Sequence, residues 1–168
     1  FVLEAALERV SARRGSVMIV ADDGSSLRVA CSGGLADAQQ GSVVPAGQGI
    51  SGWVAEHVQP LLVSNVEDLP EVNERSLKLP SPSFVSVPLE RKSTYITDTD
   101  WTEASGPQVI AVLNVTEKDD DSEFNEGDLK ALSIVANHAA AALENVRLIR
   151  DIEDAQREIV FTLGEVVE

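Results

Sequence analysis

One uninterrupted helical pattern in the last third of the sequence constrains this chain more than any other feature. From residue 125 to residue 168 the sequence is rich in alanine and contains no proline. About forty residues of helix extend about 60 Å, which is longer than a domain of this size can cover by itself. We therefore expect the far half of this helix to pack against something outside the domain.

The residues around position 125 specify where this helix begins. Asn125 is a favourable N-cap residue, and Asp128 follows three positions later, where its carboxylate can complete a capping box. Phe124 precedes the cap and Leu129 follows it by four positions, a spacing that predicts a hydrophobic staple.

Within the helix, one set of side chains recurs at alternating steps of four and three, which is a heptad spacing. The set comprises His138, Ala142, Asn145, Ile149, Ile152, Gln156, Ile159, Leu163 and Val166. We predict a homodimer, because isologous pairing is the commonest way to bury an identical apolar stripe. Its contacts would be made by the N-terminal helix and by Ala142, Asn145, Ile149, Ile152, Gln156, Ile159 and Leu163. The alternative is that the stripe packs on a downstream domain of the same chain.

A second helix is predicted at the start of the sequence. Its apolar residues are spaced as one helical face, namely Val2, Leu3, Ala6, Leu7 and Val10. Because the sequence begins and ends inside helical patterns, we expect it to be a piece of a longer protein.

The composition fits one globular domain. The chain has 168 residues, of which 43% are hydrophobic and 24% charged. Its net charge of -15 disfavours nucleic acid and anionic lipid as partners, and its apolar runs are too short to cross a membrane. The single cysteine, Cys31, suits a reducing compartment, so we expect a cytoplasmic location.

Between the two helical patterns the residues alternate as they do in strands. Strands are predicted at residues 16–20, 27–32, 61–63, 84–89 and 109–116, and a short amphipathic helix at residues 50–58. The first two strands form a hairpin. In the last strand Val109, Ala111, Leu113 and Val115 would lie on one side and Ile110 and Val112 on the other. A strand that is apolar on both sides is covered on both sides. Residues 65–79 are predicted to be a connector with one short helix, and residues 91–108 a surface loop.

Five short strings in this order resemble a GAF domain, a sensor module of signalling proteins. They are GISGWVA (49–55), QPLLV (59–63), SFVSVPL (83–89), VIAVLN (109–114), and FNEGD (124–128) with NHAAAALENVRL (137–148). The resemblance covers about residues 1–150 and implies an α+β fold, an α/β sandwich. It implies an antiparallel sheet of about six strands, with the terminal helices on one face and a ligand pocket formed by short helices and loops on the other. Residues 151–168 would be a helical linker.

The linker itself resembles a second family. The string REIVFTLGEVVE (157–168) is similar to the entry helix of HD-GYP-type phosphohydrolases, which follow GAF domains in bacterial proteins and cleave cyclic di-GMP. This resemblance implies that the output domain is a cyclic di-GMP phosphodiesterase.

The pocket is predicted at the Gly-rich helix start, at residues 83–86 on the fourth strand, and at the polar end of one face of the fifth strand. Its candidate ligand-binding residues are Gly49, Ser51, Gly52, Trp53, Ser83, Phe84, Ser86, Asn114 and Thr116, with Trp101 as a lid. The glycines and Ser51 could present backbone amides to an anion, or could serve only as a cap and a close approach of helix and sheet. For all these residues the alternative is ordinary core and cap.

A nucleotide-binding motif of some GAF domains is matched in part. Lys118, Phe124 and Asp128 fall at the motif's spacing, but Glu117 replaces its asparagine and Leu129 its glutamate. A carboxylate cannot donate a hydrogen bond as an amide does, so we favour a structural role for these residues.

The sequence shows no nucleophile–base pair and no cluster of metal ligands. Cys31 shares the predicted face of Leu27 and Val29 and is expected to be buried, while His57 and His138 each lack a second histidine at ligand spacing. The acidic run at residues 119–123 lacks the glycine and glutamate of a calcium loop. No catalytic or metal-ligating residue is predicted, and the sequence assigns no cofactor.

We therefore expect a non-catalytic module that senses a small molecule and regulates an attached output domain. A ligand-free dimerisation or spacer domain is the alternative, with its pocket filled by Trp53, Phe84 or Trp101. An enzyme is the least favoured of the three.

Overall fold

The computed structural model describes residues 1–34, 41–64, 83–91 and 108–166. Along the chain lie α1 (Val2–Arg9), β1 (Ala12–Val20), β2 (Ser26–Gly33), β3 (Val43–Pro45), α2 (Gly49–His57), β4 (Leu61–Val63), β5 (Phe84–Glu90), β6 (Val109–Lys118) and α3 (Glu126–Val166). All the predicted helices and strands outside the connectors are present. The short strand β3 was not predicted, and β1 begins at Ala12, earlier than expected. The predicted short helix within residues 65–79, and almost all of the predicted loop at 91–108, lie outside the described residues.

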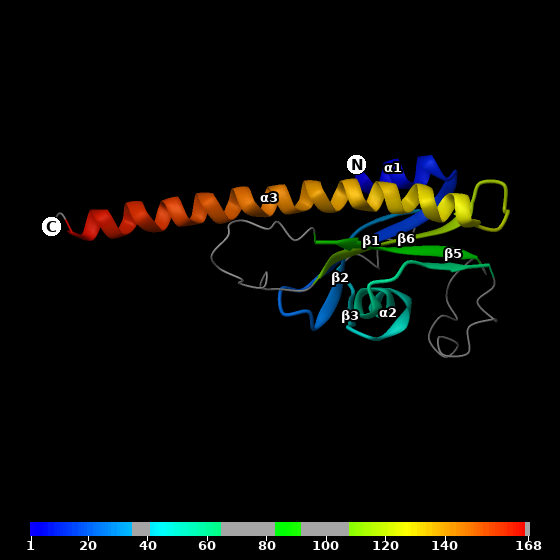
Figure 1. Cartoon of the computed structure of the whole chain (residues 1–168), viewed down its shortest axis with the longest axis horizontal. Coiled ribbons are helices and arrows are strands. Elements are labelled where there is room, and N and C mark those ends of the chain that lie inside the picture. The colour runs from blue at the N-terminus through cyan, green and yellow to red at the C-terminus, as the bar shows by residue number, and fades with distance from the viewer. Residues whose placement is uncertain (35–40, 65–82, 92–107, 167–168) are drawn as a thin grey trace, which may run out of the picture.

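The six strands form one sheet in the order β3-β2-β1-β6-β5-β4, and every neighbouring pair is antiparallel. Helices α1 and α3 lie on one face of this sheet and α2 lies on the other (Figure 1). The α+β fold expected from the resemblance is therefore confirmed.

Each face of the sheet has its own apolar core. On the face of α1 and α3, Val85, Val87 and Leu113 are buried against helical residues such as Leu132 and Ala136. A smaller core on the face of α2 contains Met18, Val20, Leu27, Val54, Val109 and Val112. The expectation that β6 is covered on both sides is therefore correct.

The start of α3 is built as its sequence predicts. The Oδ1 atom of Asn125 accepts hydrogen bonds from the backbone N–H groups of Gly127 at 2.7 Å and Asp128 at 3.2 Å. In return the backbone N–H of Asn125 donates to Asp128 Oδ2 at 2.9 Å. Phe124 is buried and Leu129 packs against the same core, as a hydrophobic staple requires.

Two β-bulges overturn predictions about which side chains share a face. In β2, Cys31 pairs with Val17 while Val29 pairs with Met18, so Ala30 is the extra residue. Cys31 is consequently placed on the opposite face from Val29, and it is exposed, where the prediction had it buried.

The second bulge lies at the start of β6. Glu90 pairs with Val109 and Leu89 with Ala111, which leaves Ile110 unpaired. Val109 therefore joins the core beneath α2, and Ile110 packs against the core of the helical face. The prediction had placed Val109 on the face where Ile110 lies, and Ile110 on the face where Val109 lies.

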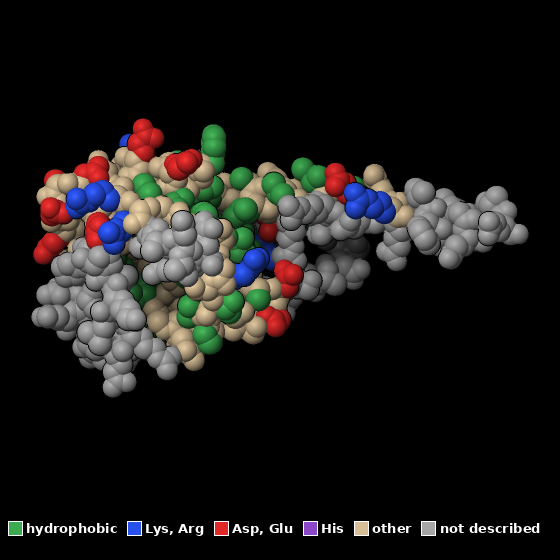
Figure 2. All heavy atoms as spheres, turned by 180° about the vertical axis from the view of Figure 1, so that it is seen from behind, with side chains coloured by type: hydrophobic (Ala, Val, Ile, Leu, Met, Phe, Trp, Pro, Cys, Tyr) green, Lys and Arg blue, Asp and Glu red, His purple; other side chains and the backbone are tan. Residues whose placement is uncertain are grey.

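Helix α3 is longer than the sheet that it covers. Leu132, Ala136, Ala139 and Ala140 are buried, but Ile149 and Ile152 are 57% and 59% exposed. In Figure 1 this part of α3 extends past the sheet, and Figure 2 shows apolar side chains at the surface along it. Of the predicted seam, Ala142, Asn145 and Gln156 are also exposed, while the side chains of Ile159 and Leu163 lie outside those described.

A pair of glycines lets α1 approach the sheet. Gly15 and Gly33 face each other across β1 and β2, beneath Leu3 and Leu7. A Cβ atom on Gly15 would lie 2.7 Å from the backbone oxygen of Asn114, whereas one on Gly33 would meet side chains, the end of Leu7 at 3.2 Å and Leu3 at 3.5 Å. Backbone cannot yield as a flexible side chain can.

We predict that Gly15→Ala lowers the free energy of unfolding by about 2–3 kcal/mol, because the added methyl group overpacks against backbone. Gly33→Ala, the matched control, should cost less than about 1 kcal/mol. Urea denaturation of both variants measures the difference. Equal losses would mean that the close approach of Gly15 to the backbone of β6 does not limit what can be placed there.

Candidate functional site

A row of polar side chains crosses the middle of the sheet on the face covered by α2. Ser16 of β1, Asn114 of β6 and Ser86 of β5 are direct cross-strand neighbours, and directly opposite residues point to the same face. Ser51 reaches this row from the first turn of α2. We call Ser16, Ser51, Ser86 and Asn114 the Asn114 cluster.

The amide of Asn114 holds the cluster together. Its Oδ1 atom accepts hydrogen bonds from Ser86 Oγ at 2.8 Å and from Ser51 Oγ at 3.1 Å. Its Nδ2 atom donates to Ser16 Oγ at 3.3 Å. Ser86 is completely buried, but Ser16, Ser51 and Asn114 each keep part of their surface accessible. The cluster can therefore offer neutral donors and acceptors to a molecule that enters beside α2.

The glycines before and within α2 have structural roles. A Cβ atom on Gly52 would lie 3.0 Å from the backbone nitrogen of Gly47 and 3.1 Å from the oxygen of Pro45, so Gly52 permits the close contact of α2 with the end of β3. Gly49 has a φ of 65°, in the region that favours glycine, and nothing lies near the place of its missing side chain. Neither glycine belongs to the hydrogen-bonded cluster.

Three predicted pocket residues lie elsewhere. Thr116 Oγ1 donates to the backbone oxygen of Ser83 at 3.3 Å, and Ser83 Oγ accepts from the backbone N–H of Phe124 at 3.0 Å. These contacts connect the sheet to the chain just before α3. Phe84 is buried at 3% exposure. Ser83 and Thr116 therefore stabilise the fold and do not join the Asn114 cluster.

Two tryptophans, Trp53 and Trp101, were predicted to belong to the pocket. Trp53 is half-buried on α2, and its ring stacks on His57 with 4.3 Å between centroids. Trp101, the predicted lid, lies outside the described residues. The sequence prediction also missed Ser16, because its place opposite Asn114 depends on the strand register.

The partial nucleotide motif forms a clasp between β6 and α3. Lys118 Nζ lies 2.7 Å from Asp128 Oδ2 and 5.4 Å from the centroid of the Phe124 ring. Glu117 has a φ of 58°, a conformation that asparagine tolerates better than most residues, and its carboxylate lies 3.0 Å from Arg14 Nε. Charged side chains gather at this end of the molecule (Figure 2). Lys118 thus contacts both Asp128 and Phe124 within the protein, as the structural interpretation of this motif expects.

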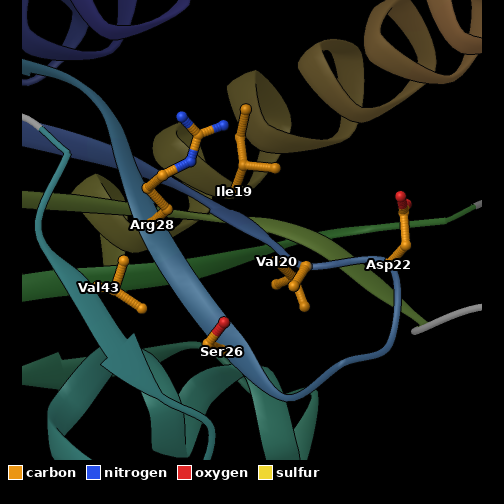
Figure 3. A pocket seen from close by; sticks show the side chains of 7 residues that line it. Ile19, Val20, Asp22, Ser26, Arg28 and Val43 are labelled. Atoms are coloured by element: carbon orange, nitrogen blue, oxygen red, sulfur yellow. The ribbon is translucent and has the colours of Figure 1, made fainter.

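A hollow of about 370 Å³ lies at the other end of the sheet. Its walls include Ile19, Ser26, Arg28 and Val43, and Figure 3 shows Ile19 and Arg28 pointing toward the side on which α3 lies. It contains none of the predicted pocket residues. Two of the side chains in its wall, Ile19 and Val43, are exposed.

The part of the chain that the structure describes contains neither a group of metal-ligating side chains nor a helix that could span a membrane. There, no three histidine, cysteine, aspartate or glutamate side chains are grouped so that they could bind a metal ion. Cys31, His57 and His138 are all exposed. Within the same residues, no helix combines the length and apolar character needed to cross a bilayer.

The shared acceptor at Asn114 predicts strong coupling with Ser86. Asn114→Ala leaves the buried Ser86 hydroxyl without its acceptor, which should lower the free energy of unfolding by about 1–3 kcal/mol. In the double variant Ser86→Ala with Asn114→Ala both partners are gone, so the loss should be smaller than the sum of the two single losses. Urea denaturation of all four proteins measures this coupling. Strictly additive losses would mean that the 2.8 Å contact contributes nothing.

The fold is shared with solved structures of low sequence identity. A methyl-accepting chemotaxis protein (residues 122 to 287) is similar with a TM-score of 0.69 and 20% identity, over 88% of this chain and 87% of that chain. The GAF-B domain of DevS from Mycobacterium smegmatis gives a TM-score of 0.66 and 18% identity, over 90% and 93% of the two chains. A free methionine-R-sulfoxide reductase from Neisseria meningitidis, in complex with its substrate, gives 0.63 and 19%, over 88% and 76%.

Sequence comparison assigns the family. No curated protein matches this sequence. The family model described as "GAF domain" matches residues 1–144, which is most of the chain and includes the whole Asn114 cluster. The fold, the order of the elements and this match agree, and the chain belongs to the GAF domain family.

Proposed function

We propose that this GAF domain is a non-catalytic sensor that binds a small molecule at the Asn114 cluster. The observation that carries the proposal is the cluster itself, in which polar side chains from three strands and α2 meet on the otherwise apolar face beneath α2. An apolar site with a few convergent polar groups is typical of a small-molecule pocket. The GAF family and its neighbours in chemotaxis and sensor proteins support a sensory or signalling role.

The charges near the cluster favour an uncharged ligand. All four side chains of the cluster are neutral, and in the described residues no lysine or arginine is hydrogen-bonded to any of them. Lys118 is paired with Asp128 at the far end of β6. A carboxylate oxygen of Glu56 lies 3.1 Å from where a Cβ of Gly47 would be, so a negative charge stands at the entry to α2. Among the described residues, a buried phosphate would therefore find no lysine or arginine hydrogen-bonded to the cluster to offset its desolvation.

We further propose that two copies pair along α3 and α1 and transmit the ligand signal to an output domain. The exposed apolar residues Ile149 and Ile152, at heptad spacing, support this pairing. That the output domain is an HD-GYP-type cyclic di-GMP phosphodiesterase, in the cytoplasm of a bacterium, rests on the sequence of residues 157–168 and on composition alone.

The ligand proposal predicts binding that depends on Asn114. We expect the dimer to bind at least one uncharged compound from a panel of nucleosides, nucleobases and amides, and to lose it in Asn114→Ala, which removes both the acceptor and the donor. Isothermal calorimetry measures this, with Ser133→Ala as control because that hydroxyl donates only to Leu129 O within α3. Cyclic GMP, the anionic probe, should not bind.

Binding that survives in Asn114→Ala would place the ligand elsewhere. If no compound of the panel binds, and native mass spectra of the purified protein show no retained small molecule, the second candidate function is favoured. That candidate is a ligand-free dimerisation domain, and one observation favours it: both acceptor positions of Asn114 Oδ1 are filled by serine hydroxyls.

The pairing proposal predicts a dimer that charge can disrupt. Ile149→Glu should weaken association at least about tenfold, because each dimer would then bury two carboxylates in its seam. Leu143→Glu is the matched control, because Leu143 is also an exposed apolar residue of α3 but does not belong to the heptad set. Sedimentation equilibrium across a range of concentrations gives both dissociation constants. A monomeric parent protein at every concentration would contradict the proposal.

A further inference from the structure

Helix α2 is a short helix on the face of the sheet opposite α1 and α3 (Figure 1). It has nine residues, and its N-cap residue Gln48 makes no side-chain capping bond. Its apolar attachment comes from Val54, which is completely buried beside Met18 and Val112, and from Trp53 and Ala55, which pack against the same core. The bond from Ser51 to Asn114 ties its first turn to the sheet. An isolated helix of this length is not stable in water, so α2 depends on the sheet for its structure.

The backbone on either side of α2 adopts conformations that change direction sharply. Gly47 and Gly49 have positive φ angles of 72° and 65° before and at its start. Val58, immediately after it, has a φ of 53° and a ψ of 38°, a left-handed conformation that is unfavourable for a β-branched residue. The helix is therefore a short unit between two backbone reversals, and the second of these carries strain.

The two serines that share Asn114 Oδ1 differ in how easily they can be displaced. Ser86 belongs to β5, which pairs with β6 over its whole length, and its side chain is completely buried. Ser51 belongs to α2, is partly exposed and makes the longer bond, 3.1 Å against 2.8 Å. A carbonyl oxygen accepts two hydrogen bonds readily. A molecule that donates a hydrogen bond to this oxygen must therefore displace the hydroxyl of Ser51 first.

We propose that the hydrogen bond between Ser51 and Asn114 is a latch that keeps α2 closed over the sheet, and that a ligand opens it by donating its own hydrogen bond to Asn114 Oδ1. This inference rests on the proposed function, because it describes how that same site is regulated. Closed and open α2 are two populations in equilibrium. The apparent affinity for ligand decreases as the closed fraction increases. The latch sets that fraction, and the ligand moves the helix by competing for one acceptor.

Hydrogen–deuterium exchange of the ligand-free protein tests the latch. We expect Ser51→Ala to raise the exchange rate of the α2 amides about fivefold, which corresponds to the loss of one hydrogen bond. Alanine favours helix more than serine does, so helix propensity alone would change the rate in the opposite direction. Ser86→Ala removes the other donor to the same oxygen and should change α2 exchange by less than about twofold. Ser133→Ala controls for the loss of a serine within a helix.

Two results would overturn the latch. One is α2 exchange in Ser51→Ala at or below the rate of the parent protein. The other is an equal rise in β5 and β6, because the variant would then have loosened the whole domain. The experiment contains no ligand, so its failure is separate from failure of the proposed function, which the binding panel decides.

Fluorescence gives a second measurement at equilibrium. Trp53 lies on α2, and Trp101 is the only other tryptophan of the chain, so Trp101→Phe leaves one reporter on the helix. In this background, Ser51→Ala should increase the quenching of Trp53 by acrylamide, and Ser86→Ala should leave it unchanged. Equal quenching in both variants would contradict a latch at Ser51.

Discussion

The antiparallel pairing of β1, β6 and β5 is the constraint on which the rest of this structure depends. Its register places Ser16, Asn114 and Ser86 opposite one another, and the same register puts Val17, Leu113 and Val87 on the other face. A slip of one residue would exchange the two faces and bury the amide of Asn114 beneath α3. The large apolar core and the polar cluster therefore fix each other, because neither can form unless the other points away from it.

Helices α3 and α2 are attached to this sheet by different kinds of contact. Helix α3 is anchored by its capping box, by the Lys118 clasp and by the buried face around Leu132, so its first half is strongly specified. Helix α2 is attached through Val54 and the bond from Ser51. The two faces of the sheet thus differ in how firmly they are covered. Local stability follows such differences, and elements that open are drawn from the weakly attached ones.

Much of the fold could be predicted because local and tertiary signals agree. The capping box at Asn125, the hairpin of β1 and β2 and the spacing of α2 are each specified within a few neighbouring residues, and all were found. The errors at Cys31 and Ile110 have one cause. A β-bulge inserts one residue and reverses the faces of the side chains beyond it. The extra residues, Ala30 and Ile110, each stand between two apolar residues, so the sequence carries no sign of the insertion. The three-residue strand β3 was missed for want of length.

The candidate site shows the same limit at a smaller scale. Ser51 was predicted from the Gly-rich helix start, Ser86 from its strand, and Asn114 from the polar end of an apolar face. Ser83 and Thr116 carry the same signal, yet they bond to the chain before α3, and only the tertiary structure separates the two groups. Ser16 could not be placed without the register. Both acceptor positions of Asn114 Oδ1 are already filled by serine hydroxyls. A ligand that donates a hydrogen bond to this oxygen must therefore displace one of them, and the displaced hydroxyl belongs either to β5, which is paired over its whole length, or to α2.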